Sequence, residues 1–317
     1  MITIIRGILK LSNKNFDTCV SFSLAKGAFV GRIVRLDKVL QDILQKHQYP
    51  INVSTALSET SALAVLLSDA LKYKGLFTLQ LQGNGPVSVL VADVTSEHKI
   101  RACAKFDEEQ LCKAKALRKT EDIIEQVPHL VGGGHMAFTV DQGPNTDLYQ
   151  GVVDLQGKTL SEIALRYFKL SEQIDTALKL FVKAPQGDSK SFFAAGIMLQ
   201  KVPLKGGNEI DTDESAYNQM FDDAKAFILS LSENEMFNSE LSSEEILYRL
   251  FHSLDLEVTK ETAYQFGCRC SREKLFSTLN SFKPEDIKDM VEDGKICATC
   301  HFCSEKYVFN EDEFVKH

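Results

Sequence analysis

Five of the eight cysteines in this 317-residue chain lie in its last fifty residues, and no other feature of the sequence constrains the fold as strongly. Cys268 and Cys270 form one group, Cys297, Cys300 and Cys303 form the other, and 29 residues separate Cys270 from Cys300. A four-thiolate zinc site needs such an arrangement, because each close pair supplies two sulfurs from one turn. Four sulfurs complete a tetrahedral shell and leave no place for a water nucleophile. The pattern therefore predicts a structural or redox-sensing zinc site and excludes a hydrolytic one.

The residues alone leave the ligand set open, because Cys297, Cys300 and Cys303 form two overlapping Cys-x-x-Cys pairs. The Cys300/Cys303 pair is followed by an alternating apolar run at residues 307–309, which suits a strand packed under a zinc-binding turn. We therefore expect this pair to be the ligands, while Cys297 and His301 stay open as alternatives. The favoured set is Cys268, Cys270, Cys300 and Cys303.

Length, charge and hydropathy restrict the class of protein. A chain of 317 residues accommodates about two domains, and its net charge of −8 argues against nucleic acid as the main partner. The sequence contains no run of 18 or more apolar residues, so we expect no membrane span. Residues 1–6 lack the pattern of an export signal. We therefore expect a cytoplasmic protein whose thiols stay reduced.

The negative charge is concentrated in one segment. Residues 206–262 contain 14 Asp and Glu against 3 Lys and Arg, a balance of −11, so the rest of the chain carries +3. From residue 263 onward, 8 basic and 10 acidic residues give no basic surface. This composition excludes a DNA-binding zinc finger.

Residues 1–205 carry the pattern of an α+β core domain. The order of the elements, with strands first, then helices, then a strand, is typical of an α+β fold. We expect helices at 33–48, 55–73, 108–126, 159–169 and 171–181, and strands at 77–82, 87–94, 99–106, 135–141, 148–155 and 191–202.

Residues 206–262 are expected to form an acidic helical linker. One apolar stripe is centred on Phe221, and a second follows the capping box that begins at Ser242. Helices this short are marginal in water, so they must dock on a neighbouring part of the chain. We expect this linker to be metastable and residues 263–317 to form the small zinc domain.

Other motif matches carry less weight. Residues 151–159 resemble a phosphate-binding loop, but five residues separate the two glycines where the loop requires four. Residues 23–26 fit a Ser-x-x-Lys nucleophile pattern without its companion motifs. The remaining cysteines are interpreted as small apolar packing residues: Cys19, Cys103 and Cys112.

The C-terminal motifs resemble the redox-regulated 33 kDa chaperonin family. Residues 266–273 (Phe-Gly-Cys-Arg-Cys-Ser-Arg-Glu) resemble its Cys-x-Cys signature, and residues 300–303 (Cys-His-Phe-Cys) resemble its Cys-x-x-Cys element. Two positions depart from the family pattern: Cys297 is an additional thiol, and residues 195–197 stand where the family has a double glycine. Similar segments occur in the same order at residues 81–86, 149–153, 167–173 and 250–252.

The resemblance implies a chaperone that holds unfolded client proteins without ATP and is not an enzyme. Such proteins are inactive when reduced and zinc-loaded, and they become active under oxidative stress. Peroxide would oxidise a zinc-bound thiolate, and a neighbouring thiol would close a disulfide. The adjacent cysteines are the expected partners: Cys268 with Cys270, and Cys300 with Cys303.

Loss of zinc is expected to unfold the zinc domain, because zinc contributes on the order of 10–16 kcal/mol to the folding of so small a unit. The linker would then lose its docking surface and expose apolar residues that bind clients and favour a homodimer. We expect these residues to include Phe221, Phe227, Leu247 and Phe251. The alternative is a thiol peroxidase or oxidoreductase that uses the same cysteines, although paired ligands differ from the isolated cysteine of a peroxidase.

Overall fold

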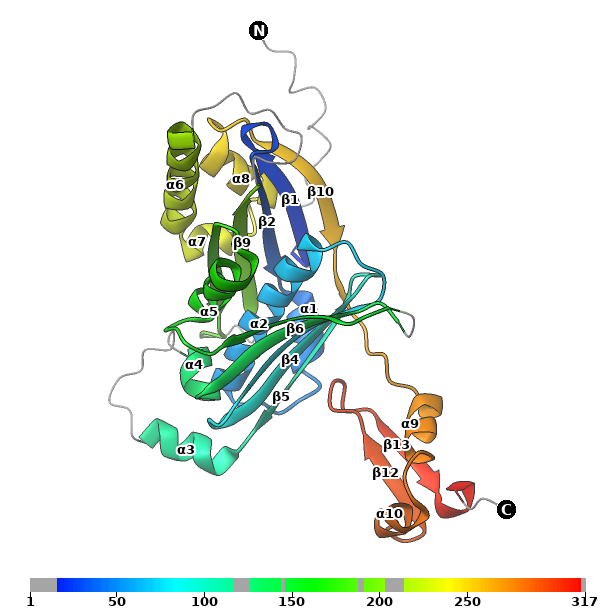
Figure 1. The fold of residues 1–317 in the computed structure, drawn as a ribbon. Coiled ribbons are helices and arrows are strands. Elements are labelled where there is room, and N and C mark those ends of the chain that lie inside the picture. Colours follow the sequence, from blue (N-terminus) through cyan, green and yellow to red (C-terminus); the bar gives the residue numbers. More distant parts are fainter. Residues whose placement is uncertain (1–15, 117–125, 144–145, 188–190, 203–213, 315–317) are drawn as a thin grey trace.

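The computed structural model describes residues 16–116, 126–143, 146–187, 191–202 and 214–314. Within these residues, two large β-sheets pack on the helix α2 (Ile51–Ala70), and a small helical and hairpin segment follows at the C-terminal end (Figure 1). This is a mixed α+β fold, as the sequence predicts.

The described residues place five strands in the first sheet, in the order β10-β1-β2-β9-β8. All of its strand pairs are antiparallel. Strands β10 and β8 are outermost among the described strands, and β10 comes from the end of the linker and pairs with β1. The strands are β1 (Thr18–Leu24), β2 (Phe29–Leu36), β8 (Thr176–Lys183), β9 (Phe193–Lys201) and β10 (Glu257–Ala263).

The second sheet has six strands among the described residues, in the order β11-β5-β4-β3-β6-β7. Only the short β11 is parallel to its neighbour, β5. The strands are β3 (Leu76–Gly83), β4 (Val87–Thr95), β5 (Lys99–Phe106), β6 (Gly134–Asp141), β7 (Tyr149–Asp154) and β11 (Gln265–Phe266).

The helix α2 lies between the two sheets and contacts strands of both. By its length and apolar composition α2 could cross a membrane, but 83% of its apolar stretch is buried inside the protein. Its apolar residues belong to the main core, so its composition is that of a central helix. Of the shorter helices in this part of the described chain, α4 (Gln126–Val131) packs on α2. The others are α1 (Lys38–Leu44), α3 (Glu108–Ala116) and α5 (Leu160–Tyr167).

The linker helices α6 (Glu214–Ser230), α7 (Glu233–Met236) and α8 (Ser243–Phe251) cover the first sheet beside β1, β2 and β9 (Figure 1). Their buried side chains form one apolar cluster with Phe22, Phe29 and other residues of that sheet. Phe251, for example, stacks on Phe22 with 5.5 Å between the ring centroids. The helices therefore bury their apolar faces on the core domain.

The C-terminal segment has a separate and much smaller core. Helices α9 (Arg272–Leu279) and α10 (Pro284–Asp289) pack with the hairpin of β12 (Lys295–Thr299) and β13 (Lys306–Asn310). The buried residues of this core are Leu279, Ile287, Ile296 and Phe309.

Most of the predicted elements are present, with two corrections. Residues 171–181 are not a helix, because a short π-helical turn at Phe168–Glu172 leads into strand β8, which pairs with β9. Residues 33–36 are not helical either, because they complete β2 before α1 begins at Lys38. The predicted helix at 108–126 is present as α3, while its residues 117–125 and the boundary near 205 lie outside the described residues.

Candidate metal centre

The four sulfurs of Cys268, Cys270, Cys300 and Cys303 all lie within 4.8 Å of one another. Two close separations join the two groups: Cys268 Sγ is 3.7 Å from Cys300 Sγ, and Cys270 Sγ is 3.4 Å from Cys303 Sγ. The structure therefore brings together the four cysteines that the sequence favours.

A tight turn between β12 and β13 places Cys300 and Cys303. The Ser304 N–H donates to the Cys300 carbonyl at 2.8 Å, and the Cys300 N–H donates to the Glu305 carbonyl at 2.9 Å. Ser304 adopts φ +57°, which closes the turn and returns the chain into β13. Phe309 of β13 is fully buried beneath the hairpin, as expected for the alternating run at 307–309.

Cys268 and Cys270 lie between β11 and α9. The Gly267 N–H donates to the Ile100 carbonyl of β5 at 3.0 Å, which fixes the chain just before Cys268. Ser271 caps α9 by accepting from the Lys274 N–H, so the chain turns into the helix directly after Cys270. The two sulfurs thus project from a short segment that is anchored at both ends.

The sulfur geometry fits zinc. A tetrahedral site with Zn–S bonds of about 2.3 Å has sulfurs about 3.8 Å apart. The separations of 3.7 Å and 3.4 Å are close to this value, and all four sulfurs are within 4.8 Å. Four thiolates also suit zinc and exclude the hard cations, which prefer oxygen ligands.

Neighbouring groups already favour a thiolate at one of the four positions. Burial alone raises the pKa of a thiol, but hydrogen bonds from the Cys270 backbone and side chain and from Arg101 lower the pKa of Cys268 to about 7. Burial raises the pKa of Cys270 and Cys303. The Tyr307 hydroxyl donates to Cys270 Sγ at 3.2 Å, which supports the charge of a thiolate at that sulfur.

The core domain contacts this cluster through Arg101 of β5. Its Nη1 lies 3.8 Å from Cys268 Sγ, and its guanidinium stacks at 3.9 Å over the ring of Phe302, which lies between Cys300 and Cys303. The buried carboxylate of Asp93 accepts from Arg101 Nε at 2.8 Å and pairs with Nη2 at 2.6 Å. Asp93 therefore fixes the orientation in which Arg101 meets both groups of cysteines.

His47 provides a second contact between the core and the same turn. In the tautomer with its proton on Nε2, His47 donates to the Phe302 carbonyl at 3.2 Å, and its Nδ1 accepts from the Ser304 hydroxyl at 3.4 Å. The His47 ring stacks on Tyr49 with 4.5 Å between the centroids. The turn that carries Cys300 and Cys303 is thus docked on the core.

The other cysteines and His301 lie outside the cluster of four sulfurs. Cys297 is exposed on β12, and neither it nor His301 belongs to the group of four. Cys19 is buried in the core, as the packing interpretation predicts, but Cys112 is exposed, and for Cys112 that interpretation is wrong. Cys103 is partly buried on β5, and burial raises its pKa to about 12.

No sequence motif marks Arg101, Asp93 or His47 as part of the site. Alternation in β5 places Arg101 on the same face as Cys103, but nothing in the sequence indicates which segment covers that face. The partners Arg101 and Cys268 are 167 positions apart, so their contact depends on the tertiary fold.

Comparison with known proteins agrees with this geometry. The family described as Hsp33 protein matches residues 17–310 of the chain. The 33 kDa chaperonin of Caulobacter vibrioides is 33% identical over 294 residues, which covers 92% of this chain and 94% of that protein. The 33 kDa chaperonins of Shewanella loihica and Pseudomonas fluorescens are also 33% identical, each across 88% of this chain.

A solved structure has the same fold. The crystal structure of the 33 kDa chaperonin (heat shock protein 33 homolog) from Thermotoga maritima superposes with a TM-score of 0.77 at 23% identity. The match covers 95% of this chain and 97% of that one.

Proposed function

This chain belongs to the Hsp33 family of chaperones, and we propose that it is a redox-regulated, ATP-independent holdase. The observation that carries the proposal is the cluster of four sulfurs within 4.8 Å of one another. In this proposal Cys268, Cys270, Cys300 and Cys303 hold one zinc ion in the resting protein. They form the disulfides Cys268–Cys270 and Cys300–Cys303 in the active one.

The chemistry of activation follows from the thiolates. Bound zinc supplies positive charge that keeps all four sulfurs ionised, and ionised sulfur is the form that peroxide oxidises. A thiolate attacks one peroxide oxygen, which gives a sulfenic acid and releases hydroxide. A second thiolate attacks that sulfur, forming the S–S bond and releasing another hydroxide. Each disulfide therefore consumes one peroxide and removes two metal ligands.

Loss of the ligands should unfold the C-terminal segment. Its core contains four buried apolar side chains among the described residues. A unit this small rarely supplies more than about 3–5 kcal/mol from its core, so it needs the metal to stay folded. Unfolding would also release Phe302 and Ser304 from Arg101 and His47 of the core.

The route from the metal centre to the linker differs from the sequence prediction. The linker was expected to dock on a surface that the unfolding zinc domain takes away, but its buried residues pack on the first sheet of the core. We propose that the signal passes instead along the chain, from Cys268 through β11 to β10, which continues directly from the linker. Release of the linker would expose Phe221, Leu247 and Phe251, which are buried in the resting structure. Their apolar surface would extend that of Phe227, which is already exposed.

We propose that the partners are unfolded or partly folded client proteins, and that the oxidised form is a homodimer. The net charge of −8 favours neither nucleic acid nor an anionic membrane surface as a partner. A cytoplasmic location is proposed because the resting state requires reduced thiols. The family is one of chaperones and not of enzymes, so the thiol peroxidase alternative is not proposed.

The test follows zinc and activity together. Aggregation of a chemically denatured client protein is measured with the reduced protein and after peroxide with mild heat, while a metallochromic dye reports released zinc. We expect one zinc per chain, little suppression before oxidation, and suppression that rises as zinc is released. Full suppression by the reduced, zinc-loaded protein would contradict the switch.

Two cysteine variants separate the ligands from the extra thiol. Cys297→Ser should retain one zinc per chain, because Cys297 is exposed and lies outside the group of four. Cys268→Ser should lose zinc. Loss of zinc in the Cys297 variant alone would refute the proposed ligand set.

A further inference from the structure

Strand β10 is held by few apolar contacts. It forms the edge of the first sheet as described, pairing antiparallel with β1 from Thr18↔Ala263 to Ser23↔Glu257. Within this strand Thr262 is buried and Val258 is half-buried, while the other side chains are exposed. Burial of apolar surface therefore adds little to its attachment, and backbone pairing with a few polar contacts must hold it.

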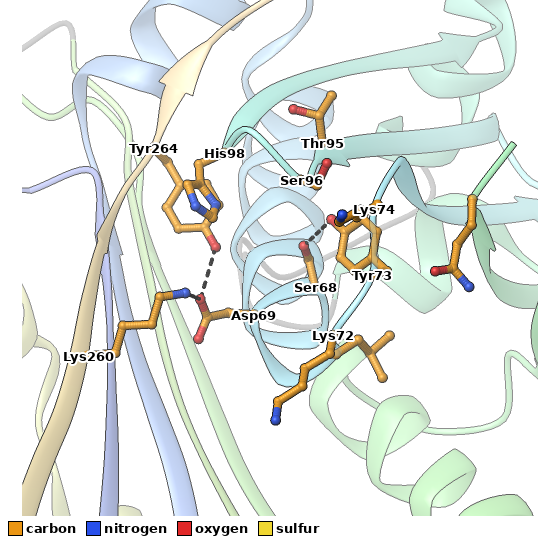
Figure 2. A pocket seen from close by; sticks show the side chains of 12 residues that line it. Ser68, Asp69, Lys72, Tyr73, Lys74, Thr95, Ser96, His98, Lys260 and Tyr264 are labelled. Carbon is orange, nitrogen blue, oxygen red and sulfur yellow. Dashed lines mark hydrogen bonds and ion pairs between the residues drawn. The ribbon is translucent and has the colours of Figure 1, made fainter.

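One polar contact joins the Thr259 hydroxyl to the Ser21 carbonyl at 3.1 Å. Three others converge on Asp69, near the end of α2, whose side chain is 2% exposed. Two side chains of β10 donate to the Asp69 carboxylate: the Thr262 hydroxyl at 3.3 Å and Lys260 Nζ at 3.5 Å. The Tyr264 hydroxyl, directly after the strand, donates to it at 3.4 Å. Figure 2 shows Tyr264 and Lys260 pointing at Asp69. All three residues line a cavity of about 590 Å³. Because Tyr264 lies four residues before Cys268, this network anchors the strand that leads into the metal centre.

Asp69 keeps partners in the core when β10 leaves. The Ser21 hydroxyl of β1 donates to Asp69 at 2.7 Å, and Arg32 of β2 forms an ion pair with it at 3.3 Å. These core contacts are shorter than or equal to the three from the β10 side. Detachment of β10 therefore does not leave a buried carboxylate without a partner, which would otherwise oppose release strongly.

Release of β10 uncovers an edge that accepts an extended chain. The backbone of β1 from Thr18 to Ser23 would stay paired with β2 and lose its partner on the other side. An unpaired strand edge readily pairs with another chain. The apolar residues Val20 and Phe22 of the same strand lie under the linker helices. When the linker and β10 leave together, the free edge therefore borders a newly exposed apolar face.

We propose that the edge of β1 is a strand-accepting site, occupied by β10 at rest and by an extended segment of an unfolded polypeptide after activation. This inference rests on the proposed function and names the site and the binding mode. The seated β10 is itself an extended segment from about 240 positions away in the chain, as the Ser21↔Lys260 pair illustrates. Main-chain hydrogen bonds give affinity without requiring a particular sequence, which suits a binder of many clients.

The direct test uses a fluorescent synthetic peptide with the sequence of residues 256–264 as the probe. Anisotropy should show binding to the oxidised protein and at least tenfold weaker binding to the reduced, zinc-loaded protein. Two further peptides of the same sequence carry methyl groups on alternate backbone nitrogens, one on the odd-numbered and one on the even-numbered residues. One of the two should bind at least tenfold more weakly than the parent peptide, because strand addition needs the N–H donors on one edge of the peptide. Equal binding of both methylated peptides and the parent peptide would overturn the proposal.

Variants of the strand test its anchoring. Thr262→Val combined with Tyr264→Phe removes one hydroxyl donor in β10 and one directly after it, and leaves Asp69 paired with Ser21 and Arg32. Hydrogen exchange of β10 in the reduced protein should accelerate about tenfold, and the peptide should now bind without oxidation. The control Glu261→Gln alters an exposed side chain of the same strand and should change neither. Unchanged exchange in the double variant would contradict the anchoring role.

Competition separates this inference from the proposed function. Saturating peptide should lower suppression of client aggregation by the oxidised protein. If suppression persists with the peptide bound, the edge is not the client site, although the redox-switched holdase stands. If oxidised protein sediments as a dimer that does not bind the peptide, β10 of a second copy occupies the edge and the proposal is wrong. Absence of any suppression after oxidation would instead refute the proposed function.

Discussion

Arg101 is a core residue that contacts both groups of clustered cysteines. It lies 3.8 Å from Cys268 Sγ and stacks on Phe302 at 3.9 Å, while Asp93 fixes its position. A guanidinium in this position stabilises negative charge on the sulfurs and packs the turn that carries the second pair. A lysine would provide the charge but not the planar stacking.

Replacing Arg101 should loosen the metal centre. In Arg101→Gln we expect zinc to be released several-fold faster under peroxide, because both the charge beside Cys268 and the stacking on Phe302 are lost. The rate is measured with a metallochromic dye under excess oxidant. Arg269→Gln removes an exposed arginine between two of the cysteines and serves as the matched control. Equal rates in the two variants would show that Arg101 does not stabilise the site.

Glu59 is a titratable group in the middle of α2, away from the metal centre. It is partly buried and forms no hydrogen bond or ion pair with the described residues, and burial raises its pKa from 4.5 to about 7. The folded protein therefore binds this proton more tightly than the unfolded chain. Its stabilising contribution is complete below about pH 4.5 and is lost as the pH rises through 7, at most on the order of 3 kcal/mol.

Glu59→Gln should therefore change the pH dependence of stability. We expect the variant to be more stable than the parent at pH 8, where the parent must ionise a partly buried carboxyl, and to lose this advantage at pH 5. Urea unfolding at both pH values measures the difference. Glu108 is exposed, so Glu108→Gln serves as a control and should change the stability by the same amount at pH 8 and pH 5. An advantage of the same size at both pH values would refute the assignment.

At the scale of elements, the linker is stabilised by the core sheet at several points. Arg35 of β2 is fully buried and donates to the carbonyls of Met236, Asn238 and Leu241, at 2.9, 2.7 and 2.6 Å. Its cation also lies 4.2 Å above the centre of the Phe16 ring. Three carbonyls of the linker thus depend on one buried core side chain, so the connection between α7 and α8 separates from the sheet only as a unit.

The contact of α8 with the sheet sets how easily the linker opens. Phe251→Ala removes a fully buried ring that stacks on Phe22 and should destabilise the docked linker by about 3–5 kcal/mol. We expect suppression of client aggregation to begin at a lower temperature after oxidation, or without heating. Tyr248→Ala, which truncates an exposed ring of the same helix, should leave this temperature unchanged. A temperature threshold that is identical in both variants would refute the role of α8.

At the scale of the whole molecule, the apolar cluster of the linker and the apolar cluster of the C-terminal segment are separate, and one stretch of chain joins them. The linker shares its core with the first sheet, whereas the C-terminal core draws only on described residues 275–314. Between them the chain passes through β10, β11 and the polar network at Asp69. The two cores can therefore lose structure in sequence instead of all at once.

Removal of the metal should reveal this order. Treating the reduced protein with a zinc chelator should accelerate hydrogen exchange across residues 268–314 and leave α2 and the second sheet protected, because these belong to the main core. Mass-spectrometric exchange on proteolytic peptides measures both regions at once. Protection of residues 268–314 that survives complete metal removal would show that the segment folds without zinc.

The sequence by itself determined the features that depend on short separations along the chain. The spacing of Cys268, Cys270, Cys300 and Cys303 predicted the cluster because two tight turns fix each pair locally. The apolar stripe of Phe221 and the capping box at Ser242 likewise predicted the linker helices. The tertiary structure alone decided what depends on distant partners. Residues 176–181 belong to strand β8 and not to a helix because β9 pairs with them, and the linker covers the core sheet because its apolar cluster is completed there. The contacts of Arg101 with Cys268, and of Asp69 with Tyr264, join residues more than 160 positions apart. No local pattern encodes such contacts, because they exist only once the sheets have packed.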